Sequence, residues 1–187
     1  NISFFFFFII MLYACNSYTN KTEDLQNKHI THKDTTINIP CIEPFIQITS
    51  IGNVDIEYSQ GEYNLQATGS PEVIDLLETT FDSGVLTVGM QNETVVELST
   101  IRNKQNIRLL ITSPELIQAG NFASGTITID SLKCNILKFE NNDIGEAVFN
   151  NVECNTTNIA TFGTTKTNIT IKAQKDISVY TGGESTI

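Results

Sequence analysis

An internal repeat in the last third of the chain constrains the fold more than any other feature. Residues 125–134 (GTITIDSLKC) align with residues 145–154 (GEAVFNNVEC) at a shift of 20, which places Gly on Gly and Cys on Cys. The apolar positions coincide as well: Ile127 with Ala147, Ile129 with Phe149, and Leu132 with Val152. A rung of about 20 residues closed by turn residues is what a parallel β-helix needs, because each coil must close before it stacks on the next.

Beyond this pair of segments the sequence predicts a looser period. Matching of apolar residues gives a shift of 22 for Leu137 on Ile159 and of 18 for Ile159 on Ile177. We therefore expect a right-handed parallel β-helix or solenoid over residues 114–187, preceded by a strand-rich unit over residues 45–113. The side chains expected to point inward are Phe139, Val148, Phe149, Ile159 and Ile169.

The composition predicts an all-β chain of one domain. The sequence has 187 residues, contains no Trp and is rich in Thr, Ile and Asn, which favour strands and turns over helices. Its net charge is −10 and its only arginines are Arg102 and Arg108, so the basic footprint of a nucleic-acid-binding protein is missing. The same charge disfavours adsorption of the folded surface on anionic lipid head groups. We expect no nucleic-acid partner.

The N-terminal residues are typical of an export signal. Residues 2–12 form an apolar run that is too short to span a bilayer and has the length of a signal-peptide core. The chain lacks an initial Met and a basic segment, so we expect that its first residues are missing. Leu12-Tyr13-Ala14-Cys15 resembles the lipobox of bacterial lipoproteins, which implies a signal peptide over residues 1–14 and a lipid anchor on Cys15. The alternative is an ordinary signal peptide followed by an incidental cysteine.

Residues 15–44 are expected to form a flexible tether, because they are polar, rich in Asn, Thr and Lys, and without periodicity. His29 and His32 lie three residues apart in this segment. A metal site needs further ligands nearby, and the required number is not visible in the sequence. We expect two solvated histidines, no metal site and no cofactor.

From Phe45 onward the pattern predicts strands. Val54, Ile56 and Tyr58 alternate with polar residues, so one face of this strand is buried. Residues 59–62 (SQGE) predict a hairpin turn whose return strand carries alternating apolar residues over 63–67.

One helix and two further strands follow in the sequence. Ser70-Pro71-Glu72 has the features of a helix start and predicts a helix over Pro71 to Thr80. Residues 82–84 (DSG) predict a turn into a strand over 85–88, and a longer strand is predicted over 107–112, ended by Ser113-Pro114.

Several of these positions together are similar to the head GIN domain, a family of "putative auto-transporter adhesins" of unknown function that is common in Bacteroidetes-type bacteria. They are Phe45-x-x-Ile48, Gly52-Asn53-Val54-x-Ile56, Gln60-Gly61, Leu65-x-Ala67, Leu76-Leu77, Asp82-x-Gly84-x-Leu86-x-Val88 and the Gly-punctuated repeats after Pro114. The resemblance covers about Phe45 to the end and implies an adhesin-type β domain. It carries no ligand or catalytic residue over to this chain. Since the family domain runs on for further rungs, we expect that a C-terminal cap is missing here.

Cys134 and Cys154 allow two interpretations because they occupy the same position in the repeat. Stacked rungs would place them about 4.8 Å apart, within the Cα range of a disulfide. Directly stacked inward side chains rarely reach the required dihedral angle, and free cysteine is a good small core residue. We expect a reduced pair in the core, with the disulfide as the open alternative. Cys41 is a further thiol without an evident role.

The acidic residues of the repeats are the remaining candidates for chemistry: Glu140, Asp143, Glu146 and Glu153. A catalytic cluster of acids needs a base or a cation in reach, and after Pro114 the chain has neither Arg nor His, only lysines such as Lys133, Lys138 and Lys166. We expect solvated charges that keep the stacked rungs from aggregating. Sequence motifs of a nucleophile elbow, a phosphate loop or a zinc protease do not occur.

These observations predict a non-enzymatic, lipid-anchored protein of the cell envelope with an adhesive or structural β-solenoid surface. We expect an outer-membrane lipoprotein, with its periplasmic or surface-exposed side left open, whose partner is an envelope polysaccharide or a protein. The alternative is a carbohydrate-active β-helix enzyme. If the chain ends at Ile187, the strand over 177–181 is left unpaired, and we expect end-to-end self-association or a natural continuation with more rungs.

Overall fold

The structure is a computed structural model that describes residues 33–41, 43–91 and 107–184. The chain divides into two compact units, Asn1–His32 and Lys33–Ile187, and the described residues all belong to the second. Within them the fold is all-β with one short helix, which confirms the predicted class. The elements are β1 Thr35–Asn38, β2 Gln47–Ser50, β3 Val54–Gln60, β4 Asn64–Gly69, α2 Pro71–Ile74, β5 Leu77–Asp82, β6 Val85–Met90, β7 Ile107–Ser113, β8 Gln118–Asn121, β9 Thr126–Asn141, β10 Glu146–Thr161 and β11 Lys166–Thr181.

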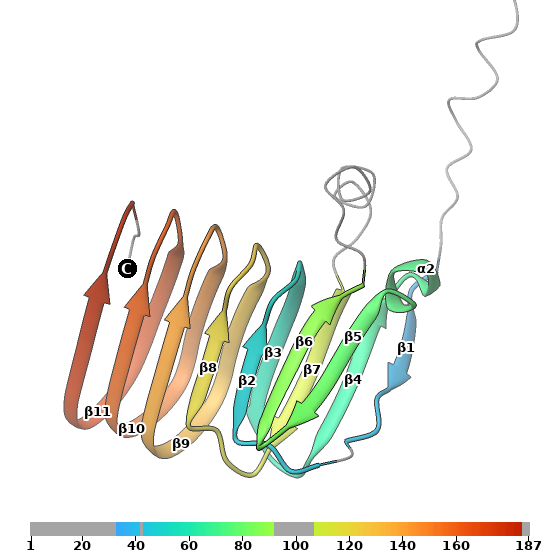
Figure 1. Ribbon diagram of the computed structural model, residues 1–187. Coiled ribbons are helices and arrows are strands. Elements are labelled where there is room, and N and C mark those ends of the chain that lie inside the picture. The colour runs from blue at the N-terminus through green and yellow to red at the C-terminus, as the bar shows by residue number, and fades with distance from the viewer. Residues whose placement is uncertain (1–32, 42, 92–106, 185–187) are drawn as a thin grey trace, which may run out of the picture. The chain divides into compact units, whose positions relative to one another are not determined.

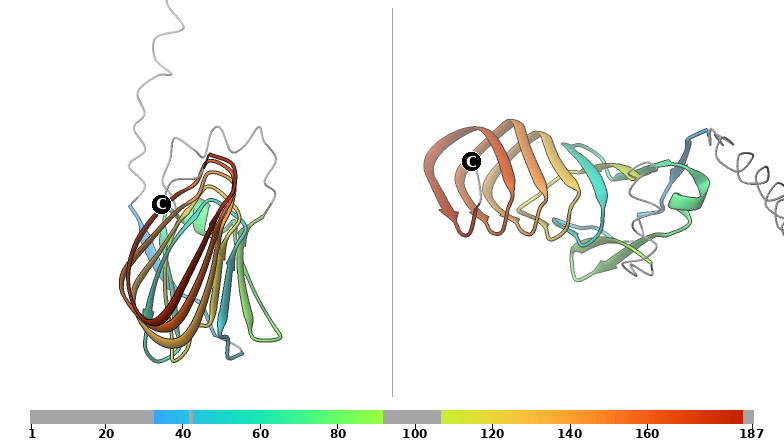
Figure 2. Two further views of the ribbon diagram at one scale, coloured as in Figure 1. Left: turned by 90° about the vertical axis from the view of Figure 1, so that its left-hand side faces the viewer. Right: turned by 90° about the horizontal axis from the view of Figure 1, so that it is seen from above.

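These strands form one curled, open sheet with two sides that face each other (Figures 1 and 2). The first side contains β1, β4, β7, β3 and the first halves of β9, β10 and β11. The second side contains β5, β6, β2, β8 and the second halves of the same three strands. Each of these long strands therefore runs along one side, around a bend and back along the other. Among the described strands β11 pairs with β10 alone, and self-association stays a prediction.

The long strands are parallel, and β9 and β10 keep a register of 20 residues; between β10 and β11 the shift falls to 19 from Val152 to Cys154 and returns to 20 at Thr156. β9 pairs with β10 from Thr126↔Glu146 to Asn141↔Thr161, and the predicted pairs around Gly125 and Cys134 are confirmed. The predicted shifts of 22 and 18 are wrong, because Leu137 pairs with Thr157 and Ile159 pairs with Val179. Thr157 is buried. It is a polar residue at an inward position, so a search for apolar matches passes over it.

The core lies between the two sides and is continuous along the unit. Phe139, Phe149 and Ile159 are buried as predicted, and the rings of Phe139 and Phe149 meet edge to face with centroids 4.8 Å apart. The inward orientation predicted for Val148 is wrong, because adjacent strand residues point to opposite faces and Phe149 is the inward one. Ile169 lies among the residues whose side chains are not described.

Buried asparagines close the turns between coils. Asn121 and Asn141 end β8 and β9 and point inward, each fully buried. Nδ2 of Asn141 donates to the carbonyl of Gly145 in the same turn at 3.1 Å and to Oγ1 of Thr167 in β11 at 3.1 Å. Nδ2 of Asn121 makes the equivalent bond to the carbonyl of Gly125 at 2.6 Å. The same contact thus recurs at the 20-residue period.

The predicted hairpin between β3 and β4 is wrong, because these two strands do not pair. β7 lies between them, parallel to β3 and antiparallel to β4. The turn after β3 therefore crosses the end of β7, where the amide of Gly61 donates to the carbonyl of Ser113 at 3.0 Å. The strand that separates them comes more than forty residues later in the chain, so local turn signals cannot reveal it.

The predicted helix is shorter than expected. α2 spans a single turn, Pro71–Ile74, and buries Val73 and Ile74. From Leu77 to Asp82 the chain forms β5, which pairs with β6 as an antiparallel hairpin. The predicted turn at residues 82–84 is confirmed, with Ser83 at φ 51° and Gly84 at φ 81°.

Part of the predicted tether belongs to the sheet. β1 pairs antiparallel with β4, and the amide of Ile39 donates to the carbonyl of Leu65 at 2.9 Å. Extended backbone can add to a sheet edge although its side chains are exposed. The predicted signal peptide, Cys15, His29 and His32 lie outside the described residues.

Candidate binding surfaces

A row of residues follows one rim of the second side, where each strand of that side ends. We call Ile51, Phe122, Asn142, Phe162 and Gly182 the rim row; they directly follow β2, β8, β9, β10 and β11. The backbone N–H of each residue donates to a carbonyl of the neighbouring strand at 2.7–2.9 Å. These hydrogen bonds of the sheet fix the backbone positions of the row. The residue before each of the first four, beginning with Ser50, is buried, so these four side chains point outward.

Two glycines, Gly120 in β8 and Gly182 of the rim row itself, leave space for the rings of the row. A Cβ at Gly120 would lie 2.5 Å from Cε2 of Phe122, so the ring occupies the position of the missing side chain. A Cβ at Gly182 would lie 3.0 Å from Cδ1 of Phe162. The Phe162 ring also contacts the ring of Tyr180 in β11, with centroids 5.6 Å apart.

The apolar members of this surface remain accessible to solvent. Phe122 is 41% exposed, Phe162 36%, Ile51 52% and Tyr180 61%. A shallow groove of about 220 Å³ adjoins Ile51. It is lined by Ile51, Glu78, Thr80, Thr87, Gly89 and Met90. Sequence reasoning missed this surface; the available signal was two Phe residues at a spacing of 40, twice the repeat.

The acidic residues proposed from the sequence are not gathered into one cluster. Glu146 lies 3.6 Å from Nζ of Lys166 and Glu153 lies 3.9 Å from Nζ of Lys133, so both form ion pairs between neighbouring coils. Oε1 of Glu140 accepts a hydrogen bond from Nδ2 of Asn142 at 2.7 Å. Asp143 occupies the turn after β9 with φ 66°. These contacts give three of the four acids a role in the repeat.

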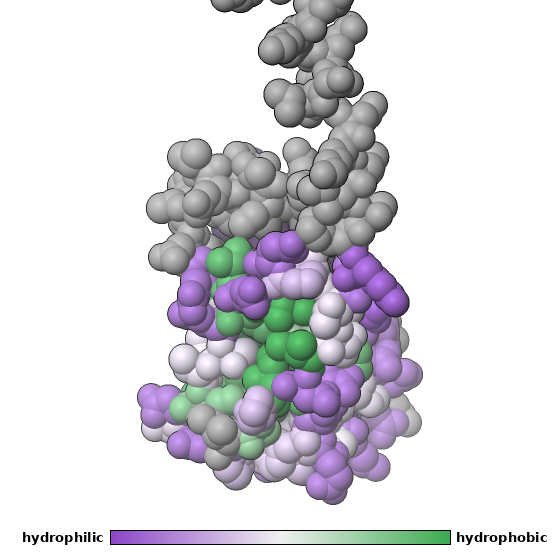
Figure 3. Space-filling view, turned by 90° about the vertical axis from the view of Figure 1, so that its right-hand side faces the viewer, coloured by the Kyte–Doolittle hydropathy of each residue, from purple (hydrophilic) through white to green (hydrophobic). Residues whose placement is uncertain are grey.

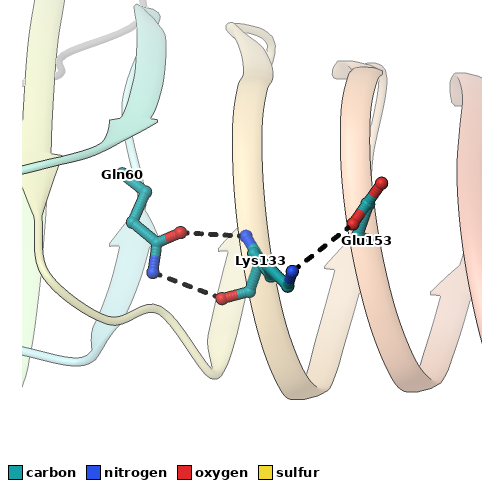
Figure 4. A network of polar contacts seen from close by, with 3 residues as sticks. All are labelled: Gln60, Lys133 and Glu153. Carbon is teal, nitrogen blue, oxygen red and sulfur yellow. Dashed lines mark hydrogen bonds and ion pairs between the residues drawn. The ribbon is translucent and has the colours of Figure 1, made fainter.

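A cleft of about 390 Å³, lined mostly by polar residues, lies near the bend of the first side, and Figure 4 draws Gln60, Lys133 and Glu153 from its lining. Its lining is Gln60, Ser131, Leu132, Lys133, Asn150, Asn151, Val152 and Glu153. The side-chain amide of Gln60 pairs with the backbone of Lys133: Oε1 accepts from its N–H at 2.9 Å and Nε2 donates to its carbonyl at 3.2 Å. Gln60 thereby extends the ladder beyond the end of β3. The two charged residues of this lining, Lys133 and Glu153, form an ion pair with each other.

The cysteines of the repeat are bonded, which corrects the expectation of a reduced pair. Cys134 and Cys154 form a disulfide with their Cα atoms 4.8 Å apart, the predicted spacing. Buried and more exposed residues alternate along β9 except at residues 130–131 and 135–136, where the strand bends. Cys134 therefore lies in the short segment between two bends and not in a straight part of the strand. Cys41 is free and half-buried, and its burial raises the pKa of its thiol.

The end of the unit formed by β1, β4 and β5 carries a second apolar patch. Figure 3 shows apolar side chains gathered at the centre of this end, with hydrophilic residues around them. Ile37 and Tyr63 are exposed, and the ring of Phe45 contacts those of Tyr63 and Phe81. This patch continues the core and needs no ligand to explain it.

The part of the chain that the structure describes holds no group of three or more His, Cys, Asp or Glu that could bind a metal ion. Among the described residues, no helix has the length and apolarity to cross a membrane.

Comparisons with known proteins agree with this fold. A putative adhesin from Parabacteroides merdae matches with a TM-score of 0.58 at 18% identity, over 73% of this chain and 56% of that one. A putative adhesin from Parabacteroides distasonis matches with a TM-score of 0.62 at 13% identity, over 81% of this chain and 67% of that one. One from Bacteroides fragilis matches with a TM-score of 0.53 at 16% identity, over 83% and 96%. At such identities the likeness shows the fold alone.

The sequence itself gives a family match. A search among curated proteins finds no relative of this chain. Residues 44–187 match the family described as "putative auto-transporter adhesin, head GIN domain", which confirms the resemblance inferred from the sequence. Because the match covers most of the sequence, the chain belongs to the head GIN domain family of putative auto-transporter adhesins.

Proposed function

We propose that this protein is a non-catalytic binding module of the cell envelope, with an adhesive or structural role. The observation that carries the proposal is the 20-residue register of β9 on β10, which repeats outward side chains along one surface. The acids of the coils support it too, because Glu146 and Glu153 pair with lysines of neighbouring coils and are not directed at a common point. The family, named for adhesins, favours the same role.

We further propose that the coils belong to a right-handed parallel β-solenoid held at the outer membrane by a lipid on Cys15. A solenoid presents a long face from a short repeat, which suits an extended partner. Two or more acyl chains on one residue give stable anchoring, whereas a single chain does not. Cys15→Ser should release the protein from the detergent phase or stall its processing. Intact-mass analysis that finds cleavage at another residue and no acyl group would contradict the anchor.

The binding role is tested against catalysis in a single experiment. The protein, immobilised on beads, is mixed with isolated envelope material, and both retained polymer and released reducing sugar are measured. We expect retention without product. Release of reducing ends that grows with time would instead identify a carbohydrate-active enzyme and overturn the proposal. Beads carrying heat-denatured protein control for non-specific capture.

A further inference from the structure

We propose that the rim row and Tyr180 bind an extended, neutral polysaccharide that lies across the strands of the second side. This inference rests on the proposed binding role and names the site and the chemical class of the ligand. The residues that carry it are Phe122, Asn142, Phe162 and Tyr180, with Ile51 and its groove at one end.

The spacing of the row fits a polymer that advances by one sugar per strand. Neighbouring strands of a sheet lie about 4.8 Å apart, so Phe122 and Phe162, two strands apart, are separated by about 10 Å. Asn142 occupies the strand between them, and the row therefore alternates ring, amide and ring. An extended chain of pyranose units repeats its faces in a similar way, with an apolar C–H face on every second sugar.

The rings are placed for stacking and not for core packing. Phe122 lies over Gly120, where a side chain would collide with the ring, and Phe162 lies against Gly182, where a Cβ would make a tight contact of 3.0 Å. Glycine within a strand weakens the strand and often marks a position where a ligand or another backbone approaches closely. Both rings nevertheless remain more than a third exposed, so part of each ring is open to a ligand. The electron-rich face of an aromatic ring attracts the weakly positive C–H groups of a sugar.

Polar groups beside the rings supply hydrogen bonds for hydroxyl groups. Asn142 and Glu140 are bonded to each other and both are half-exposed, so their carbonyl and carboxylate oxygens can still accept hydrogen bonds. The bond between them fixes both side chains next to the rings. This combination of rings and hydrogen-bond acceptors is typical of carbohydrate sites more than of purely apolar protein contacts.

Charge selects among the polysaccharides. The chain carries a net charge of −10, which repels polyanions such as anionic envelope polymers, nucleic acids and acidic lipid surfaces. A neutral polymer avoids this repulsion. From the groove between β5 and β6 to β11 the surface crosses seven strands, and it can therefore contact several sugars in succession.

The test measures binding of purified neutral polysaccharides by affinity electrophoresis, with xylan, galactomannan, hydroxyethyl cellulose and mixed-linkage β-glucan as probes. The assay uses protein that starts at residue 16, because every described strand lies beyond residue 33. Ring variants are Phe122→Leu, Phe162→Leu and Tyr180→Leu, alone and combined. Leucine keeps an apolar side chain and removes the aromatic face. The matched control is Leu110→Ala, an apolar side chain on the first side with the same 41% exposure as Phe122.

We expect at least one neutral polysaccharide to retard the protein, each ring variant to weaken its binding about tenfold, and the triple variant to abolish it. Leu110→Ala should bind as the unaltered protein does, and circular dichroism should show that all variants fold. If the leucine variants bind normally, the surface is a general apolar contact or the site lies elsewhere, and the inference is overturned. If no neutral polysaccharide binds although envelope material is retained, the inference fails while the proposed binding role stands.

Discussion

Replacement of Asn141 by Ala removes the side chain that closes the turn between β9 and β10. Asn141 is fully buried and its Nδ2 group donates to the carbonyl of Gly145 and to Oγ1 of Thr167, both at 3.1 Å. A typical hydrogen bond contributes about 0.5–1.5 kcal/mol, so loss of two costs about 1–3 kcal/mol. The carbonyl of Gly145 keeps the N–H of Lys166 at 3.3 Å, which limits the penalty at that end. We therefore expect a loss of about 2 kcal/mol in the free energy of unfolding.

Urea unfolding followed by far-ultraviolet circular dichroism measures this loss, because the chain has no Trp for fluorescence. Asn150→Ala is the matched control: Asn150 is exposed and its Nδ2 donates to Asp130 Oδ1 at 3.0 Å, also between coils. It should change stability by less than about 0.5 kcal/mol. Asn141→Thr should fall between the two, since Thr161 occupies the equivalent position in the next coil. If Asn141→Ala and Asn150→Ala cost the same, the buried amide does not hold the turn.

Three further changes test the core, the disulfide and the buried phenol. Phe149→Ala should cost about 3–5 kcal/mol in urea unfolding, because the side chain is 1% exposed and packs on Phe139; a cost below 1 kcal/mol would contradict its burial. Reduction of Cys134–Cys154, which closes a loop of 20 residues, should cost about 3 kcal/mol, and an unchanged urea midpoint would contradict the bond's role. Burial raises the pKa of Tyr58, so the stability that this phenol contributes is complete below the ordinary phenol pKa of about 10 and is lost as the pH rises above it. Tyr58→Phe should remove this loss of stability at alkaline pH, and thermal melts from pH 8 upward measure it.

The repeat could be predicted where its landmarks are chemically distinctive. Gly and Cys recur at a shift of 20 and fix the pairs of Ile127, Ile129 and Leu132 with their partners. The prediction failed further along, because Thr157 takes an inward position that Leu137 holds in the preceding coil. A buried Thr is indistinguishable in sequence from a surface Thr. Apolar matching therefore chose Ile159, two residues too far along.

Local patterns also misplaced pairings that depend on distant strands. Residues 59–62 contain good turn chemistry, but β7 pairs with both β3 and β4 and keeps them apart. Leu76 and Leu77 fit a helical spacing, but the hairpin with β6 stabilises Leu77–Asp82 as a strand. In both cases tertiary pairing outweighs a local preference, because each ladder satisfies many backbone groups at once.

The candidate surface was not predicted from the sequence for a related reason. Phe122 and Phe162 have no distinguishing neighbours, and aromatic residues in β-rich sequences are more often core than surface. Only the observed register shows that each follows an inward Asn or Thr and therefore points outward. Their alignment in one row depends on the exact period, which the sequence analysis placed too loosely.

The most direct test of the account is to map where a neutral oligosaccharide touches the protein. The ¹⁵N-labelled protein from residue 16 is titrated with a hexasaccharide cut from the polysaccharide that binds most tightly, and amide chemical shifts are followed. We expect the amides of Phe122, Asn142 and Phe162 to shift together and saturably, while those of Gln60 and Lys133 in the polar cleft stay unchanged. Shifts confined to the cleft, or none at the rim row, would contradict it.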